Sequence, residues 1–406
     1  MRQNGNNTEA HQRLIMDQFT KQAVPFSQMP DHSPDLILAA TEVGPTDTVL
    51  DVACGPGVLA CAFAQVARHV TGIDLAPAMI DRAKALQQSH SLANLTWRIG
   101  DVLPLPLPDA SFSLVFTHYS FHHFLDPKAV LAEMVRVCSP GGRVAVVDVF
   151  TSSPEQAEAF NRMERLRDPS HVRALELEEL SGLLGEAGLQ SVWRKFYKHE
   201  FGLEAVLTGS FPNPGDGERV RQLFEDDLGM DRLGLGVHRR DGDIHFAYPI
   251  VILGGDKPPR SFGARRGEVA YTERPAAYAV VAGENGTVAA VRGAAGMIGL
   301  PGGGSLPGEC PEETLVREVR EELARSVRLV SKIGEAKQFF YAADEDCHYK
   351  MLGAFFLAEF PDEPNGQGEH ELFWLPVAEA AGAFFHECHA WAARQGLERS
   401  TQGPQA

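Results

Sequence analysis

The chain is 406 residues long, too long for one ordinary hydrophobic core, which favours two or three domains. It has a formal net charge of −17, with 44% hydrophobic and 22% charged residues. This acidic balance argues against binding a DNA or RNA polymer but leaves nucleotides open as small-molecule ligands. No window approaches the roughly 18 uninterrupted apolar residues of a membrane span, so no membrane partner is expected.

The N-terminus and the cysteines both predict a cytoplasmic location. The first residues, MRQNGNNTEAHQRL, are polar and lack the apolar core of a signal peptide. The cysteines show no C-x-x-C spacing and are predicted to be buried free thiols, not disulfides or zinc ligands. They are Cys54, Cys61, Cys138, Cys310, Cys347 and Cys388.

From about residue 46 to 150, short apolar runs alternate with helix-like segments. The predicted strands are TDTVLDVA, HVTGIDLA, LTWRIGDV, FSLVFTHY and RVAVVDVF. With helices predicted at 76–88 and 128–137, this alternation is typical of a parallel, doubly wound α/β sheet. Residues 151–200 are predicted to be helical, with one helix closing at Gly188, and residues 248–253 to be a late strand of the sheet.

The sequence changes character after residue 255. Residues 256–269, rich in Gly, Pro and Arg, are predicted to be a linker. Two β runs then flank Asn285-Gly286, a strong hairpin signal. The Gly-rich segment LPGGGSLPGE, a helix, further strands including KMLGAFFLAEF, and a final helix over about 377–394 complete the pattern.

A helix starting at Pro311 is predicted to carry three glutamates on one face. Glu318, Glu321 and Glu322 stand at i, i+3 and i+4, opposite a stripe of apolar residues. Carboxylates crowded in this way repel one another unless a cation neutralises them, and oxygen ligands suit Mg²⁺ or Mn²⁺. Arg317 lies one turn before Glu321 and is expected to pair with it.

The segment resembles the Nudix box, G-x5-E-x7-R-E-U-x-E-E-x-G-U, from Gly303 through Glu309 to the glutamate helix. A solvated acidic helix face is the alternative interpretation, but it does not explain the Gly-rich loop or these two offsets. The sequence departs from the box at Ala324 and Arg325, where the family has Gly and an apolar residue. The resemblance implies a Nudix fold, an α+β domain built as an α/β/α sandwich, over residues 270–398.

The Nudix resemblance further implies metal-dependent hydrolysis of a nucleoside diphosphate linked to another moiety. It makes Glu318, Glu321 and Arg317 catalytic candidates. The metal ligands that it implies are Glu318, Glu321, Glu322 and the carbonyl of Gly303. A further acidic ligand would come from a later loop, where the sequence does not choose between Glu369 and Glu371.

In the first half, the strand TVLDV leads into the glycine-rich turn ACGPG and then a helix. Such a turn lets the backbone approach a ligand at a helix N-terminus, and taken alone it also fits a nicotinamide-binding turn. Three aspartates tilt the choice. Asp51 precedes the glycines, Asp74 ends the second strand where it could accept ribose hydroxyls, and Asp101 follows the third strand where it could meet an adenine amino group.

With LAEMVRVCSPGGRVAVVDV downstream, residues 10–255 resemble a class I S-adenosylmethionine-dependent methyltransferase of the small-molecule type found in ubiquinone and menaquinone biosynthesis. Residues 150–255 leave no room for a nicotinamide-type substrate domain, which favours this interpretation over a dehydrogenase. The resemblance implies a Rossmann-like fold, S-adenosylmethionine as cofactor and a small-molecule methyl acceptor. The cofactor-binding residues that it implies are Asp51, Ala53, Gly55, Gly57, Asp74, Leu75, Asp101, Val102 and Thr117.

Just past the fourth strand, THYSFHHFLDP places His118, Tyr119, His122 and His123 at the rim where α/β sheets bind ligands. His122 is a candidate base if the acceptor must lose a proton. The alternative is that these side chains pack around the cofactor, and a metal pair of His118 and His122 would require a helix there. His171 is a further candidate for the acceptor site.

Together the two halves predict a bifunctional enzyme that transfers a methyl group in one domain and hydrolyses a diphosphate in the other. The alternative is that only one domain is catalytic, while the other binds a nucleotide or S-adenosylmethionine as a sensor or scaffold. Sensor-type Nudix domains often lose part of the carboxylate set, and all three glutamates are present here, which favours catalysis.

Overall fold

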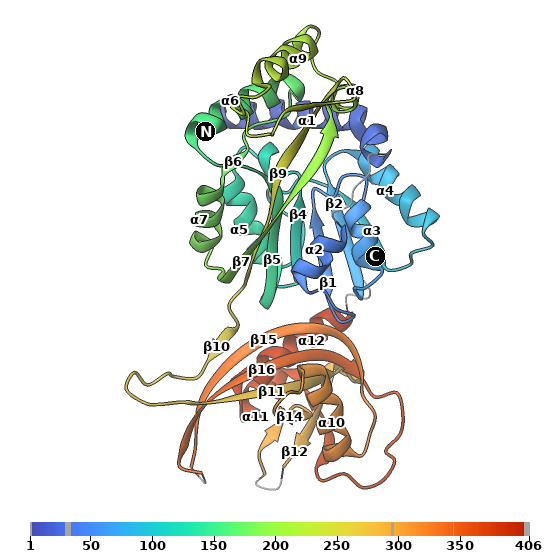
Figure 1. Ribbon diagram of the computed structural model, residues 1–406. Helices are drawn as coiled ribbons and strands as arrows, with labels where there is room; N and C mark the ends of the chain where they lie inside the picture. Colours follow the sequence, from blue (N-terminus) through green and yellow to red (C-terminus); the bar gives the residue numbers. More distant parts are fainter. Residues whose placement is uncertain (1, 29–33, 294–295, 344, 402–406) are drawn as a thin grey trace. The chain divides into compact units, whose positions relative to one another are not determined.

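The computed structural model describes residues 2–28, 34–293, 296–343 and 345–401 (Figure 1). The chain divides into two compact units. The first comprises residues 1–44, 49–138 and 143–257, and the second residues 45–48, 139–142 and 258–406. Within the described ranges, no helix combines the length and apolarity that crossing a membrane requires.

The first unit is built on a sheet whose five leading strands are those predicted. They are β1 (Thr48–Val52), β2 (His69–Asp74), β3 (Leu95–Ile99), β4 (Phe112–His118) and β5 (Cys138–Thr151). The sheet order is β3-β2-β1-β4-β5-β9-β7, where β9 (Asp243–Asp256) and β7 (Gln190–Gly202) pair with each other antiparallel and β9 is also antiparallel to β5. The predicted late strand is therefore part of β9, and the Rossmann-like α/β class is confirmed.

Both faces of this sheet are buried because successive strand residues point to opposite sides. In β1, Val49 joins the core on one face and Leu50 the core on the other. The first core includes residues of α2 (Pro34–Thr41), α3 (Val58–Ala64), α6 (Pro154–Arg167), α8 (Leu203–Ser210) and α9 (Asp216–Asp227). The second includes residues of α5 (Pro127–Val137) and α7 (Leu177–Glu186), while α4 (Pro77–Ser89) packs beside β2 and β3.

The expectation of helix throughout residues 151–200 is wrong for its last part. α6 and α7 are helices, and α7 is followed by Gly188 at φ +78°, as the C-cap prediction required. Residues 190–202 instead form β7. Its sequence QSVWRKFYKHEFG is rich in β-branched and aromatic residues, and β9 offers it a free edge with which to pair.

Several further elements of the first unit were not predicted. α1 (Arg2–Gln28) precedes the sheet, and Figure 1 shows it running across the end of the sheet. Two short strands, β6 (Leu175–Glu176) and β8 (His238–Arg240), pair with β5 and β9. α1 therefore adds a cover at the edge where ligands of α/β sheets bind.

The second unit contains a five-stranded sheet in the order β10-β15-β16-β11-β14 and a three-stranded sheet in the order β13-β12-β17. Their bounds are β10 (Arg260–Phe262), β11 (Thr272–Val281), β12 (Thr287–Arg292), β13 (Ile298–Gly299), β14 (Gly302–Gly304), β15 (Arg328–Ala342), β16 (Cys347–Glu359) and β17 (Glu371–Pro376). Alternate residues of β11 enter two cores, one shared with α10 (Pro311–Leu323) and the other with α12 (Glu387–Thr401). This is the expected α/β/α arrangement.

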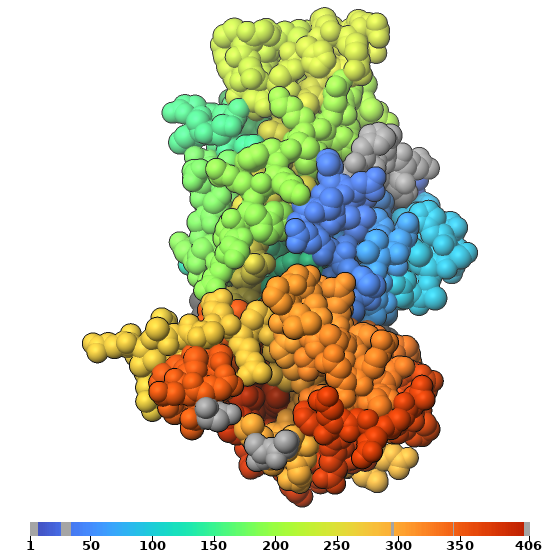
Figure 2. All heavy atoms as spheres, turned by 60° about the horizontal axis from the view of Figure 1, so that its bottom comes forward, coloured from blue at the N-terminus to red at the C-terminus, as the bar shows by residue number. Residues whose placement is uncertain are grey.

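Three sequence expectations in this unit are corrected. Part of the predicted linker forms β10, which pairs with β15, and the chain beyond it projects as a loop from the surface (Figure 2). The Asn285-Gly286 turn exists, with both residues at positive φ, but β11 and β12 diverge from it into different sheets. The expected single final helix is split into α11 (Ala380–Ala383) and α12, because Phe384 is extended.

The cysteine prediction is confirmed in part. All six thiols are free, and Cys54, Cys61, Cys138 and Cys388 are buried. Cys310, however, is exposed and Cys347 half-buried. Cys310 lies at the N-cap of α10, where its backbone N–H donates to Glu313 at 3.0 Å, so the segment serves as a helix start.

The departure from the Nudix box at Ala324 has a local structural consequence. Ala324 ends α10 in the left-handed conformation, with φ +49°. A Cβ is unfavourable in that region, at a cost of roughly 1 kcal/mol that glycine avoids. The adjoining Arg325 lies over the ring of Phe360, with 5.4 Å from its guanidinium carbon to the ring centroid, so this end of the helix remains packed.

Replacing Ala324 with glycine should therefore stabilise the second unit. We expect Ala324→Gly to raise the free energy of unfolding by about 1 kcal/mol, since it removes the left-handed strain. Scanning calorimetry of the full chain measures this as a higher transition temperature. Ala187→Gly is the control: Ala187 ends α7 at an ordinary φ of −73°, so glycine there should not stabilise.

Candidate active sites

A cavity of about 700 Å³ opens in the first unit at the carboxyl ends of β1, β2 and β4. Most of the residues that the sequence assigned to cofactor binding line it: Asp51, Ala53, Gly55, Asp74, Leu75, Asp101 and Val102. The turn after β1 runs through Ala53 and Gly55 at positive φ, and a Cβ at Gly55 would meet no atom within 4 Å. The backbone there is therefore open to a ligand.

Two carboxylates face this cavity from neighbouring strands. Asp74 accepts the backbone N–H of Gly55 at 2.8 Å and of Ala76 at 2.9 Å, which fixes the turn to the end of β2. Asp51 is buried, and its Oδ1 has no hydrogen-bond partner among the described residues. Burial raises the pKa of Asp51 well above its ordinary value, and the nearby Asp74 raises it further. The pair favours a cationic ligand.

Two of the predicted cofactor-binding residues do not line the cavity but support the structure around it. Gly57 begins α3 at φ +79°, where a Cβ would lie 2.7 Å from both Ala83 and Trp97, so its role is close packing. The Thr117 hydroxyl is buried and donates to the carbonyl of Val52 at 2.7 Å, tying β4 to β1. Neither residue lines the cavity.

The histidine cluster forms the far wall of the cavity. His122 lies in the single 3-10 turn Phe121–His123, so the helix needed for a His118–His122 metal pair is absent from this segment. Its Nδ1 lies 2.6 Å from Oδ1 of Asp148, and its backbone N–H donates to Oδ2 at 3.0 Å. Asp148 also accepts the N–H of Val149 at 2.7 Å, so the carboxylate is held in one orientation.

Electrostatics separates the three imidazoles of this cluster. Burial alone would lower the pKa of His122, but the charge and hydrogen bond of Asp148 raise it above the ordinary 6.5. Burial and the neighbouring His122 lower the pKa of His123 to about 4. The same two causes lower that of His171, whose ring centroid lies 5.3 Å from that of His122. His122 is therefore the imidazole that takes up a proton most readily.

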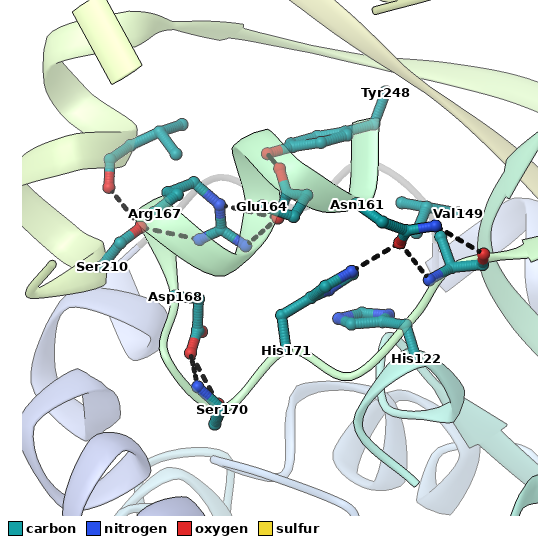
Figure 3. Close-up of polar contacts among 12 residues, drawn as sticks. His122, Val149, Asn161, Glu164, Arg167, Asp168, Ser170, His171, Ser210 and Tyr248 are labelled. Carbon is teal, nitrogen blue, oxygen red and sulfur yellow. Dashed lines mark hydrogen bonds and ion pairs between the residues drawn. The ribbon is translucent and has the colours of Figure 1, made fainter. Parts of the chain in front are cut away.

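A polar network on α6 completes this end of the cavity (Figure 3). Glu164 accepts hydrogen bonds from Arg167 and, at 2.7 Å, from the hydroxyl of Tyr248. Asp168 accepts from the hydroxyl of Ser170 at 2.6 Å, and His171 Nε2 lies 2.7 Å from Oδ1 of Asn161. His171 is thus bonded behind the wall and does not line the cavity, contrary to the expectation that it faces the acceptor.

Sequence reasoning missed several wall residues. α1 contributes Phe19 and Gln12, whose amide donates to Asp101. β7 and β9 contribute Phe201 and Ile250. The clearest neglected signal was Asp148, a single carboxylate in the otherwise apolar run RVAVVDVF near the carboxyl end of its strand.

In the second unit, Arg317 organises the predicted glutamate helix. Its guanidinium donates to Glu309 at 2.7 Å, to Glu318 at 2.7 Å and to Glu321 at 3.0 Å. The expected pair with Glu321 is therefore confirmed, as one of three contacts with glutamates. It also donates to the carbonyl of Gly304 at 2.9 Å, which joins the helix to the Gly-rich strand. Arg317 lowers the pKa of Glu309 to about 2, so this carboxylate is a fixed anion.

Glu322 lies at the centre of a carboxylate cluster. Its Oε2 accepts the N–H of Gly302 at 2.9 Å, and its Oε1 lies 2.9 Å from Nδ1 of His370. Burial raises the pKa of Glu322 to about 8, with further contributions from Glu318, Glu369 and Glu321.

Of the two acidic residues left open by the sequence, Glu369 is the one near this cluster. The other, Glu371, lies in β17 with its Oε2 3.6 Å from Nε of Arg292. The loop that carries Glu369 approaches α10 most closely at Gly368. A Cβ at this position would overlap the carbonyl of Glu322, so the close approach requires glycine.

Gly303 lies directly against the carboxylate of Glu318. A Cβ at this position would overlap that carboxylate, so a side chain there would make the end of Glu318 turn away. In the side-chain arrangement seen here, residues 2–28, 34–293, 296–343 and 345–401 contain no group of three His, Cys, Asp or Glu side chains set as metal ligands. Glu318 is turned toward Arg317 instead.

Comparison with known proteins assigns each unit to a protein family. A family profile described as "Methyltransferase domain" matches residues 50–146, and a profile described as "NUDIX domain" matches residues 272–398. The uncharacterized methyltransferase YcgJ of Bacillus subtilis is 34% identical over 227 residues, which cover 55% of this chain and 89% of that protein. The chain therefore belongs to the class I methyltransferases through its first unit and carries a NUDIX hydrolase domain in its second.

A second curated relative and a solved structure are also similar to part of this chain. The 27-O-demethylrifamycin SV methyltransferase of Amycolatopsis mediterranei is 34% identical over 148 residues, 36% of this chain and 54% of that protein. The crystal structure of YcgJ superposes with a TM-score of 0.52 at 24% identity, covering 56% of this chain and 98% of that one. This likeness shows the shared fold.

The contact at Gly303 can be tested directly. We expect Gly303→Ala to destabilise the second unit by about 1 kcal/mol, because the added methyl group turns the Glu318 carboxylate away from its hydrogen bond with Arg317. Urea unfolding measures the loss. Gly304→Ala is a matched control, since its Cβ would approach Arg274 no closer than 3.6 Å. Equal effects of the two substitutions would contradict this role for Gly303.

Proposed function

We propose that the chain is a bifunctional enzyme. Its first unit transfers a methyl group from S-adenosylmethionine to a small-molecule acceptor. Its second unit hydrolyses a nucleoside diphosphate linked to another moiety, with Mg²⁺ or Mn²⁺ as cofactor. The observation that carries the first activity is the buried Oδ1 of Asp51 in the cavity wall, which has no hydrogen-bond partner in the described part of the chain. The carboxylate cluster around Glu322 supports the second activity.

The cavity fits the chemistry of S-adenosylmethionine. This molecule has a sulfonium and an ammonium cation, a ribose diol and an adenine ring. Asp51 supplies an oxygen without a partner for a cation, and Asp74 keeps lone pairs free for hydroxyl donors beside its two backbone bonds. Asp101 lies on the same cavity with Val102 as an apolar neighbour. When bound, the cofactor would supply an electrophilic methyl group.

The carboxylate cluster of the second unit fits a hard divalent cation. Burial, and after it the charges of Glu318, Glu369 and Glu321, raise the pKa of Glu322 to about 8, so its ionised form is disfavoured without a cation. A cation relieves this repulsion, and oxygen donors are the ligands that Mg²⁺ and Mn²⁺ prefer. Arg317 would hold Glu318 and Glu321 in place by its fan of hydrogen bonds. When bound, the metal would polarise the diphosphate and lower the pKa of a water molecule.

Cofactor binding is testable at Asp51. We expect Asp51→Asn to weaken binding of S-adenosylmethionine by roughly 10- to 100-fold, because a charged hydrogen bond is lost. Because the pKa of Asp51 is raised, the carboxyl must lose its proton to bind a cation, so wild-type affinity should increase as pH rises through that pKa. Isothermal titration calorimetry measures both. Asp81→Asn, on the exposed surface of α4, should bind as the wild type does.

Hydrolysis is testable at Glu322. A screen of nucleoside triphosphates, dinucleotides and nucleotide sugars with Mg²⁺, read as phosphate and pyrophosphate release, should find a substrate. We expect Glu322→Gln to reduce its turnover by roughly 100-fold or more, since a buried carboxyl oxygen that would become anionic on binding the metal is removed. Glu312→Gln, in the first turn of the same helix, should retain activity. If no substrate class were hydrolysed in a metal-dependent way, this activity would be excluded.

A further inference from the structure

We propose that the wall around His122 is the acceptor site of the methyltransferase unit. In this proposal His122 acts as the general base, and Asp148 holds it and stabilises its charged form. The acceptor is a neutral, largely apolar molecule with an acidic hydroxyl group, phenolic or enolic. The inference rests on the proposed methyl transfer and goes beyond it by naming the acceptor class and the group that receives its proton.

The hydrogen bonds of His122 decide which of its ring atoms faces the acceptor. Asp148 holds Nδ1 at 2.6 Å, so Nδ1 carries the hydrogen of the neutral ring and Nε2 keeps a lone pair. Because His122 lines the cavity and its other nitrogen is bonded away from it, Nε2 is the atom available to a ligand. A carboxylate behind an imidazole also stabilises the imidazolium that forms when the proton arrives.

Of the three neighbouring imidazoles His122, His123 and His171, only His122 has a raised pKa. The titratable groups around it are Asp148 on β5, His123 in the same 3-10 turn, His171 after α6, and Glu164 and Arg167 on α6. His123 and His171 have lowered pKa values, partly because His122 is beside them. The arrangement therefore directs a proton from the cavity to His122.

The rest of the wall selects a neutral and apolar acceptor. Phe19, Val149, Phe201, Val206 and Ile250 are among the residues that line the cavity. Its charged side chains are engaged with protein partners, Glu164 with Arg167 and Tyr248, and Asp168 with Gln22 and Ser170. An ionised acceptor would have to disrupt these buried bonds, at a cost that a neutral hydroxyl compound avoids.

The acidity of the hydroxyl follows from the strength of the base. A phenol has a pKa of about 10, within reach of an imidazole whose pKa is raised above 6.5, whereas an aliphatic alcohol is far less acidic. In the step, the acceptor oxygen forms a bond to the methyl carbon while the carbon–sulfur bond of the sulfonium breaks. The hydroxyl proton moves to Nε2 of His122, and the sulfur leaves as a neutral thioether.

The first test needs no turnover. Histidine labelled with ¹⁵N in the full chain, loaded with S-adenosylhomocysteine, reports tautomer and titration by NMR, and His122→Gln assigns the signal. We expect His122 to be the Nδ1–H tautomer with a pKa above 6.5, and Asp148→Asn to lower that pKa. If His122 had an ordinary pKa and Asp148→Asn left it unchanged, the role of His122 and Asp148 as a general base and its supporting carboxylate would be overturned. Calorimetry with S-adenosylhomocysteine tests cofactor binding separately, so failure of the proposed methyl transfer is recognised independently.

The second test uses three matched acceptors and labelled S-adenosylmethionine: 1-naphthol, 1-naphthalenemethanol and thioanisole. We expect methylation of 1-naphthol alone, with kcat rising with pH through the pKa of His122 because the neutral ring is the base. His122→Gln should lower kcat by about 100-fold or more and remove this pH dependence with little change in KM. Asp148→Asn should move the pH dependence to lower pH.

A control variant and two outcomes make the second test decisive. His199→Gln removes another imidazole of the same wall, whose Nδ1 lies 3.4 Å from the hydroxyl of Tyr119, and it should change KM but keep the pH dependence. Methylation of thioanisole at a rate unaffected by His122→Gln would overturn the proposal. So would the absence of 1-naphthol methylation by a chain that binds S-adenosylhomocysteine.

Discussion

Both sites depend on one physical constraint, the burial of a carboxylate that has other carboxylates beside it. In the first unit, Asp51 and Asp74 meet at the carboxyl ends of adjacent elements, and the buried Asp51 is left with an unpartnered oxygen. In the second unit, α10 and the following loop bring several glutamates around Glu322. Such repulsion lowers the stability of the fold unless a positive charge compensates it. Each cluster therefore marks a place where a cationic ligand or a metal ion would bind favourably.

The backbone that creates these clusters depends on close approaches that only glycine permits. In the second unit, Gly368 lets the loop before β17 lie against the backbone carbonyl of Glu322. In the first unit, Gly57 allows α3 to start against Ala83 and Trp97, which sets the turn that faces the cavity. The glycines thus act mainly through packing, and their contribution to ligand binding is the position that they give to neighbouring carboxylates.

Much of the fold follows from local sequence, because both periodicity and turn chemistry are local properties. The five leading strands, the α10 start at Pro311 and the end of α7 before Gly188 were predicted in this way. Elements that depend on distant partners were not. β7 forms because it pairs with the edge of β9, and β10 forms because it pairs with β15. β11 and β12 enter different sheets after a turn whose sequence alone predicts a hairpin.

The same division holds for the sites. The motif residues Asp51, Asp74 and the α10 glutamates lie where their spacing predicts, since each follows directly from one strand end or one helix face. The partner of His122 is instead 26 residues away on β5, and nothing in the local sequence of His122 indicates it. Yet Asp148 decides the chemistry, because it separates His122 from two imidazoles that are its close neighbours. Without that carboxylate, burial would lower the pKa of all three, and the cavity would present histidines but no effective base.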